Sequence, residues 1–466
     1  SCHLSTQMKS SGIILAAAMF VCGGAYADLT VDTALVLGPV KPMHGVNNGP
    51  VKARGDQTRG NFPAYAAAKI PFARTHDASF YSAYGGEHTV DITAIFPDFS
   101  KDPNDPASYD FVVTDHYLKS IREAGTEVFF RLGQKIEHGV KKYGTLPPPD
   151  FAKWAVVCEH IIRHYNEGWG DGFRWNIRYW EIWNEADLDR DDSKNKRCWG
   201  GTEAEFFEFY RIAASHLKKS FPELKIGGPA IAGNLGWADR FLASMAKGDR
   251  VPLDFFSWHI YCTKPSQMTE RARKVRELMK QHGYEKAESI LDEWNYVRGW
   301  SGEFVYSIRT IIGQKGAAFT AACMCACQDA PVDILMYYDA RPTVFNGLFD
   351  YYTFAPLKGY YPFLAWSKLA ALGTGVSCAI TDEKDIYATA AVNKEGKIAM
   401  LVCRYSDDDN VQGAKPLTVR LKEGSLEGAR CTLTDSSHTF AEIPVAAKDG
   451  VLELMLEPNA FVLIER

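Results

Sequence analysis

The chain has 466 residues, of which 46% are hydrophobic, 13% aromatic and 23% charged, and its formal net charge is −5. This length allows one large domain of about 250–300 residues and a smaller one, and the composition is ordinary for a soluble globular protein. The most basic segment, residues 271–280, is typical of the solvated face of a helix. The chain therefore has no basic run that would indicate a nucleic acid or an anionic membrane as a partner.

The first residues have the pattern of a targeting segment. A short positive region begins at Met8, an apolar core covers residues 12–22, and the small-x-small sequence AYA ends at Ala27. The core is too short to span a bilayer, so the pattern predicts an exported protein, periplasmic or secreted, with cleavage near Ala27. Lipidation at Cys22 is the alternative, but Val21 stands where that signal needs a small residue.

From about residue 43 to residue 340, short apolar runs alternate with amphipathic helical patterns, as in repeated βα units. The eight predicted strands cover residues 43–47, 70–76, 127–133, 178–185, 225–229, 254–261, 289–295 and 334–339. The clearest predicted helices cover residues 114–124, 152–165, 203–220 and 270–282. Eight strands with interleaved helices over roughly 300 residues predict an α/β fold of the (β/α)8 type, a TIM barrel.

The composition shifts after about residue 373, where turn signals separate short strand-like runs. These predicted strands cover residues 386–392, 397–404, 417–421, 430–433, 451–456 and 461–465. They predict a C-terminal antiparallel β-sandwich, and residues 29–37 alternate like a further strand of it. The predicted organisation is a targeting segment at 1–27, an N-terminal strand at 28–42, the barrel at 43–373 and the β-sandwich at 374–466.

Two predicted strands end in related patterns, YWEIWNEA at 179–186 and ILDEWNY at 290–296. An apolar run that stops at a carboxylate is typical of a buried parallel strand whose C-terminal end delivers a catalytic group. Glu185 ends the fourth strand and Glu293 lies near the end of the seventh, so both open onto the same face of the barrel. Two carboxylates are what hydrolysis of a glycosidic bond requires, and this placement can bring them about 5 Å apart. For either Glu alone, a packed strand closed by a salt bridge is the alternative.

Other strand ends supply candidate sugar contacts. The candidate substrate-binding residues are Asn184, Arg74, His76, His259, Tyr261, Trp294, Tyr338 and Asp339. Arg74 and Tyr261 are expected to reach Glu293 and to keep it ionised by charge and hydrogen bonding. Three tryptophans offer apolar platforms for the CH faces of a pyranose: Trp183, Trp294 and Trp199. Each histidine could equally be hydrogen-bonded scaffold, and Arg74 could be a structural ion pair.

The sequence resembles the glycoside hydrolases of clan A, and most closely family 39, which includes β-xylosidases and α-L-iduronidases. The resemblance extends past the two Glu motifs to residues 109–133 and 206–230, and it covers most of residues 43–300. It implies that Glu185 is the acid/base and Glu293 the nucleophile of a retaining mechanism, that Asn184 precedes the acid/base, and that His259 and Tyr261 line the site.

The sequence departs from the family pattern in two places. Asp187 stands where the acid/base motif usually has Pro-Asn, and Tyr338 with Asp339 stands where a Trp is usual for the clan. A buried Asp that accepts two hydroxyl hydrogen bonds discriminates strongly between sugars. We therefore expect Asp339 to bind the non-reducing sugar and the specificity to differ from that of a simple β-xylosidase. The alternative is that Asp339 pairs with Arg341 or Arg74 as scaffold.

The expected function is an exported retaining exo-glycosidase that acts on plant or microbial polysaccharide fragments. An endo-acting enzyme and an inactive carbohydrate-binding protein on the same scaffold are the alternatives. The segments 134–149 and 186–201, which follow the third and fourth strands, are expected to wall a pocket, which favours exo action. No cofactor or metal is expected, because the sequence has no His-Glu-x-x-His helix, phosphate loop or glycine fingerprint.

Overall fold

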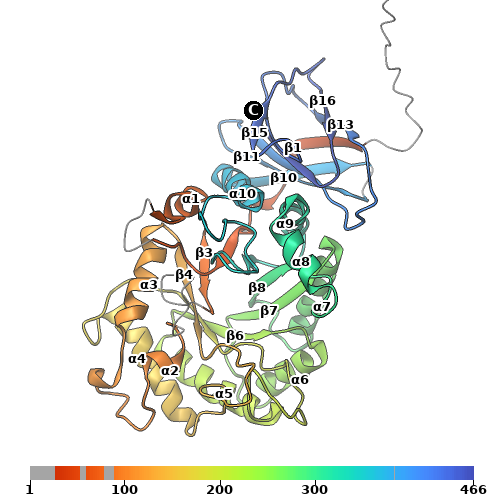
Figure 1. The fold of residues 1–466 in the computed structure, drawn as a ribbon. Coiled ribbons are helices and arrows are strands. Elements are labelled where there is room, and N and C mark those ends of the chain that lie inside the picture. The colour runs from red at the N-terminus through yellow and green to blue at the C-terminus, as the bar shows by residue number, and fades with distance from the viewer. Residues whose placement is uncertain (1–26, 53–58, 78–88, 382–383) are drawn as a thin grey trace, which may run out of the picture.

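The structure is a computed structural model that describes residues 27–52, 59–77, 89–381 and 384–466. The predicted targeting segment therefore lies outside the described residues, apart from Ala27. Figure 1 shows a barrel with helices around it and a separate β-domain against one side. None of the described helices is long and apolar enough to cross a membrane.

Eight strands close into the barrel, and each pairs in parallel with the next. They are β2 (Gly45–Asn47), β3 (Phe72–Thr75), β4 (Glu127–Leu132), β5 (Tyr179–Ile182), β6 (Lys225–Ile231), β7 (Phe255–Cys262), β8 (Glu288–Tyr296) and β9 (Ile334–Tyr337). The predicted TIM barrel is confirmed. β5 ends earlier than predicted because Trp183 and Glu185 have positive φ values of 73° and 50°, which a strand cannot contain.

The helices lie outside the barrel strands, and all except α10, which follows β9, lie between them in sequence. They are α1 (Phe62–Ala67), α2 (Ile92–Ile95), α3 (Val112–Glu123), α4 (Phe151–Glu167), α5 (Glu203–Ser220), α6 (Leu235–Ala246), α7 (Pro265–Gln281), α8 (Phe304–Ile311), α9 (Gln314–Gln328) and α10 (Tyr361–Leu372), with 3-10 turns at Pro106–Ser108 and Lys358–Tyr360. Thr202 is the N-cap of α5 and forms a capping box with Glu205. Gly125 and Gly283 follow α3 and α7 with φ values of 81° and 78°, the left-handed conformation that helix ends favour.

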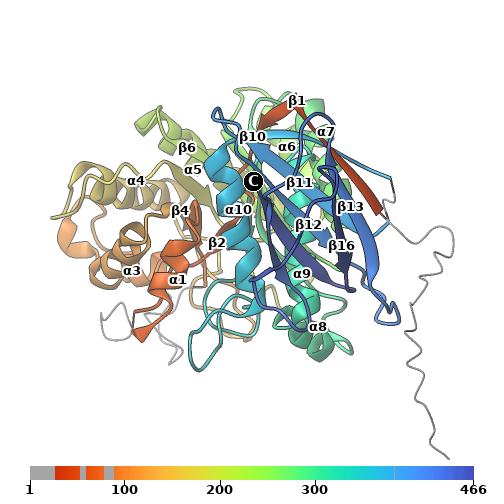
Figure 2. The same cartoon turned by 90° about the horizontal axis from the view of Figure 1, so that it is seen from above.

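The β-domain is one nine-stranded sheet in the order β15-β14-β17-β12-β11-β10-β1-β13-β16. Its strands are β1 (Ala27–Pro39), β10 (Thr374–Ile380), β11 (Ile386–Val392), β12 (Ile398–Arg404), β13 (Lys415–Leu421), β14 (Arg430–Thr434), β15 (Ala441–Ile443), β16 (Leu452–Leu456) and β17 (Ala460–Glu465). β1 lies between β10 and β13, antiparallel to the first and parallel to the second. Figure 2 shows the strands of this sheet, and their buried side chains form a hydrophobic core of their own, which confirms the predicted C-terminal β-sandwich domain. The sequence analysis missed β10 and β15.

One face of this sheet packs on the barrel. Leu401, Cys403 and Leu463 belong to the same hydrophobic core as the buried side of α9. Cys325 on α9 approaches the carbonyl oxygen of Leu401, and its thiol is buried. The described cysteines are all unpaired, and eight of these nine are buried, as small apolar side chains would be.

The interior of the barrel changes from apolar to charged along its axis. At the N-terminal ends of the strands it is filled by a cluster of large side chains: Phe72, Phe129, Tyr179, Phe255, Ile290, Ile334 and Met336. Side chains two residues apart point the same way along a strand. The next inward positions of β3, β5 and β8 are therefore Arg74, Glu181 and Asp292, all fully buried. This charged layer forms the floor of the candidate site.

Candidate active site

Arg74 is the centre of the charged layer. Its Nε lies 2.7 Å from Oε1 of Glu181 and 3.1 Å from Oδ2 of Asp292. Its Nη1 donates to Oε2 of Glu293 at 2.9 Å, and its Nη2 donates to Oδ1 of Asn184 at 2.7 Å. The expected contact between Arg74 and Glu293 is therefore present, and the same guanidinium also orients Asn184. One buried cation thus fixes side chains that come from β5, β8 and the segment after β5.

The sequence analysis missed Glu181 and Asp292, although both are charged residues inside otherwise apolar strands. Burial raises the pKa of Glu181 well above its ordinary value, and Asp292 raises it further while Arg74 opposes the shift. Burial also acts to raise the pKa of Asp292, but Arg74, Glu181 and His259 hold it below its ordinary value. Of these two neighbouring carboxyls, Glu181 is therefore the more readily protonated. A proton there reduces the negative charge that Arg74 has to balance.

Arg74→Met should destabilise the fold, because it leaves Asp292 and Glu293 buried without their cation. Removing one partner of a buried ion pair costs about 3–5 kcal/mol, and the loss should appear in denaturant unfolding at neutral pH. Arg190→Met is the matched control, because Arg190 pairs with Asp192 at 3.2 Å while their side chains are 85% and 75% exposed. That exposed pair should matter little. Equal unfolding midpoints for the two variants would contradict a central role of Arg74 in the charged layer.

An irregularity in β8 brings two consecutive carboxylates to the site. The register between β7 and β8 shifts between Trp258, opposite Leu291, and His259, opposite Glu293. Asp292 is the extra residue, and such a bulge re-aims the side chains that follow it. As a result Asp292 lies 3.0 Å from Nε2 of His259, and Glu293 lies 3.5 Å from Nδ1 of the same ring. Strict alternation along the strand would have turned one of the two carboxylates away.

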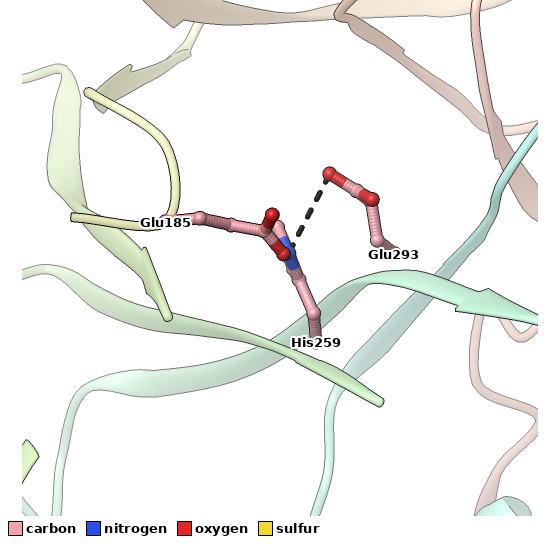
Figure 3. A group of neighbouring side chains, drawn as sticks. All are labelled: Glu185, His259 and Glu293. Carbon is pink, nitrogen blue, oxygen red and sulfur yellow. Dashed lines mark hydrogen bonds and ion pairs between the residues drawn. The ribbon is translucent and has the colours of Figure 1, made fainter. Parts of the chain in front are cut away.

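Glu185, His259 and Glu293 converge from different strand ends, as Figure 3 shows. Nδ1 of His259 is 2.7 Å from Oε2 of Glu185, and the nearest ligand atoms of all three side chains lie within 4.8 Å of one another. Burial disfavours the charged imidazole, but Glu293 and Asp292 raise the pKa of His259 well above its ordinary value. An imidazolium between the two glutamates reduces their mutual repulsion. The three side chains could also ligate a cation, but here the same atoms bind one another.

Tyr261 completes the environment of Glu293. Its hydroxyl donates to Oε1 of Glu293 at 2.5 Å, while Arg74 occupies the other oxygen. Burial raises the pKa of Glu293, the nearby Glu185 adds to this, and His259, Arg74 and Tyr261 oppose it. The expected arrangement of Arg74 and Tyr261 on this carboxylate is thus present, but burial outweighs their effect on its pKa.

His76 and Tyr338 border the same site. Nε2 of His76 lies 3.8 Å from Oε2 of Glu293, and its Nδ1 accepts from Nε of Arg131 at 2.9 Å. The Tyr338 hydroxyl donates to Asp77 at 2.8 Å, and its ring lies 6.5 Å from that of Tyr261. Both candidate residues are therefore close to the paired glutamates.

The three tryptophans expected to stack on a sugar are buried outside the barrel interior. Trp294 follows Glu293, so it points away from the site and packs against Phe319 and Tyr337. Trp183 packs against Trp199, and both are at most 3% exposed. The prediction of Trp294 as a substrate-binding residue, and of the other two as platforms, is therefore wrong. Their large apolar rings are core side chains between strands and helices.

Asp339 binds other side chains of the protein and does not face the site as the sequence analysis expected. It is fully buried, accepts from Nδ2 of Asn48 at 2.9 Å and lies 3.1 Å from Nη2 of Arg341. Burial raises its pKa to about 6, against the opposing effect of Arg341. These contacts correspond to the scaffold alternative, and they correct the expectation that Asp339 binds the sugar.

The second departure from the family pattern, Asp187, is a structural anchor. Its carboxylate accepts from the backbone N–H groups of Ala232, Gly233 and Asn234 at 2.7, 3.1 and 2.9 Å. Asn234 is the N-cap of α6. Asp187 therefore ties the segment behind Glu185 to the loop between β6 and α6.

The two segments expected to wall the pocket bind each other. Glu137 N donates to the carbonyl oxygen of Arg197 at 2.9 Å, and Gly200 N donates to that of Thr145 at 2.8 Å. The Glu137 carboxylate accepts from the N–H groups of residues 143–145. The segments after β4 and β5 are thus joined into one structure on the C-terminal side of the barrel.

A TIM barrel that holds two carboxylates within 4.8 Å at its C-terminal end has the architecture of a retaining glycoside hydrolase. Residues 84–299 match the family described as Glycosyl hydrolases family 39. The matched residues are a little under half of the chain, and they support its resemblance to the clan A glycoside hydrolases of this family.

Similar proteins agree with this resemblance. The chain is 31% identical over 166 residues to a β-xylosidase of Caldicellulosiruptor saccharolyticus, which is 34% of this chain and 32% of the relative. It is 30% identical over 176 residues to a β-xylosidase of Geobacillus stearothermophilus, which is 33% of each. The chain thus aligns with about a third of the length of these curated relatives. A glucosidase structure from Croceicoccus marinus matches the fold with a TM-score of 0.76 and 23% identity, covering 95% of this chain and 99% of the other.

Proposed function

We propose that the protein is an exported retaining exo-glycosidase that releases terminal sugars from plant or microbial polysaccharide fragments by double displacement. The observation that carries the proposal is the placement of Glu293, which is held by Arg74 and Tyr261 within reach of Glu185. Retaining glycosidases need their two carboxyls about 5–5.5 Å apart, whereas inverting enzymes leave room for a water between them.

The roles follow from the contacts. One oxygen of Glu293 attacks the anomeric carbon, while Glu185 gives a proton to the departing glycosidic oxygen. Glu185 then takes a proton from the water that cleaves the glycosyl-enzyme. Arg74 holds the oxygen of Asn184, so the amide NH2 of Asn184 is the group available to a sugar hydroxyl. The hydrogen bond from His259 keeps the Glu185 carboxylate turned toward Glu293.

Exo action is supported by the hydrogen bonds that join the segments after β4 and β5, because we expect the joined segments to wall one side of the pocket. Export is supported by the sequence before Ala27, since cleavage there would remove only the first residue of β1. Sequencing of the mature N-terminus tests export. A β-xylosidic bond is the first substrate to examine, because two curated relatives are β-xylosidases.

A panel of p-nitrophenyl glycosides, beginning with the β-D-xyloside, tests the proposed activity. Turnover of any member separates an enzyme from an inactive sugar-binding protein. Release of single sugars from the end of a matching oligosaccharide separates exo from endo action. Absence of turnover across the panel and on oligosaccharides would overturn the proposal.

The first product should have the same anomeric configuration as the substrate. Two successive displacements at one carbon restore its configuration, and the separation of the glutamates fits this route. Proton NMR at early times distinguishes the product anomers before mutarotation mixes them. An inverted first product would contradict the role of Glu293 as nucleophile.

A further inference from the structure

Among the tryptophans in the part of the chain that the structure describes, Trp300 alone is largely exposed. It is 60% exposed, whereas the other tryptophans are buried or partly buried. It lies after β8 and before α8, hence on the C-terminal side of the barrel where the paired glutamates are. A large aromatic ring left in water at such a place is typical of a binding surface.

Trp300 is separated from the nucleophile by a single side chain. Its ring lies 5.1 Å from that of Tyr261, at an interplanar angle of 77°. The hydroxyl of Tyr261 is the group that donates to Glu293 at 2.5 Å. A sugar ring held on the glutamates and a ring held on Trp300 would therefore be neighbours along one substrate.

The indole ring of Trp300 packs against two further aromatic rings. Phe304 lies 6.0 Å from it at an angle of 24°, and Phe345 lies 6.0 Å from it at an angle of 48°. Both of these rings are themselves partly buried. The Trp300 ring therefore packs against Phe304, Phe345 and Tyr261, and its remaining surface is open to a ligand.

The loop that carries Trp300 is held from two sides. Arg298 N donates to Oγ of Ser307 at 2.9 Å, and the Arg298 guanidinium lies over the ring of Tyr306. The same guanidinium is 3.0 Å from Asp407 of the β-domain. A prepositioned aromatic ring loses little freedom when a ligand binds.

We propose that Trp300 is the platform for a second sugar ring, bound next to the ring that Glu185 and Glu293 cleave. This inference rests on the proposed function, because exo action leaves one ring on the glycone side and places the second in the leaving group. The ligand is a disaccharide or longer β-linked chain whose apolar CH face covers the indole.

The test compares wild type, Trp300→Ala and Trp300→Phe on two substrates with the same glycone. These are the methyl glycoside of the sugar whose p-nitrophenyl glycoside the panel shows to be turned over fastest, and the corresponding trisaccharide. Trp300→Ala should lower kcat/KM on the trisaccharide about tenfold, the scale of a single aromatic contact, and change the hydrolysis of a methyl glycoside less than about threefold. Trp300→Phe should recover part of the loss. Met455→Ala, which trims an exposed apolar side chain of the β-domain, is the control and should change neither rate.

Equal effects of Trp300→Ala on the trisaccharide and the methyl glycoside would overturn the proposal while leaving the proposed function intact. If no glycoside is turned over, the proposed function fails, and calorimetric titration of xylotriose into wild type and Trp300→Ala decides the Trp300 proposal. Weaker binding to Trp300→Ala alone supports it. Equal affinity, or no binding to wild type, overturns it.

Discussion

Glu293→Gln should abolish turnover of every substrate that the wild type cleaves. An amide cannot form the glycosyl-enzyme, and removal of a covalent nucleophile costs on the order of 10⁴-fold or more in rate, about 5.5 kcal/mol in barrier. The measurement is kcat on the best p-nitrophenyl glycoside, with the unfolding transition recorded in parallel to show that the variant is folded.

The matched control is Glu203→Gln, since Glu203 pairs with Arg240 on the surface at the start of α5. It makes the same chemical change away from the site and should leave kcat unaltered. Activity of Glu293→Gln within about tenfold of wild type would exclude Glu293 as the nucleophile, whatever its contacts with Arg74 and Tyr261.

Glu185→Ala should slow the enzyme in a way that depends on the leaving group. A nitrophenolate departs without a proton, whereas a sugar alkoxide does not, and general acid catalysis contributes typically 10²–10⁴-fold. The loss on an oligosaccharide should therefore exceed the loss on a nitrophenyl glycoside, and kcat/KM on the two substrates measures the difference.

Azide gives a second and independent readout on Glu185→Ala. Once the general base is missing, water attacks the glycosyl-enzyme slowly, and azide needs no base. Added azide should raise the rate of the variant and yield a glycosyl azide, while the wild type should not respond. Equal losses on both substrates without azide rescue would assign Glu185 another role.

The sequence was sufficient to predict the barrel and the convergence of its two glutamates at one end. Parallel strands buried on both faces appear in the sequence as short apolar runs. The helices between them appear as apolar residues that recur with the helical period. A carboxylate at the end of such a run has to open at the C-terminal face, which is why Glu185 and Glu293 could be paired without coordinates. Arg74, Tyr261 and His259 followed from the same rule, since each lies near the C-terminal end of a strand.

The failed expectations have local physical causes. Trp294 was assigned to the sugar because of its neighbour in sequence, yet adjacent residues of a strand point to opposite sides. Asp292 was missed because the bulge that lets Asp292 and Glu293 both face the barrel interior has no sequence signature comparable to a glycine or proline. Asp339 was misassigned because its partners, Asn48 and Arg341, are set by packing between distant segments. Trp300 lies in a loop, where no periodicity indicates the direction of a side chain.

The position of β1 in the sheet determines when the β-domain can fold during synthesis. β1 ends at Pro39, and the strands on its two sides, β10 and β13, begin at Thr374 and Lys415. At the usual 5–20 residues per second, a ribosome needs roughly tens of seconds to synthesise the segment that separates β1 from its first neighbour. During that time the barrel can form while both edges of β1 are unpaired, and unpaired edges invite aggregation. β1, the first strand of the described residues, is thus among the last to be paired on both sides, and loss of either β1 or the C-terminal strands leaves the same sheet incomplete.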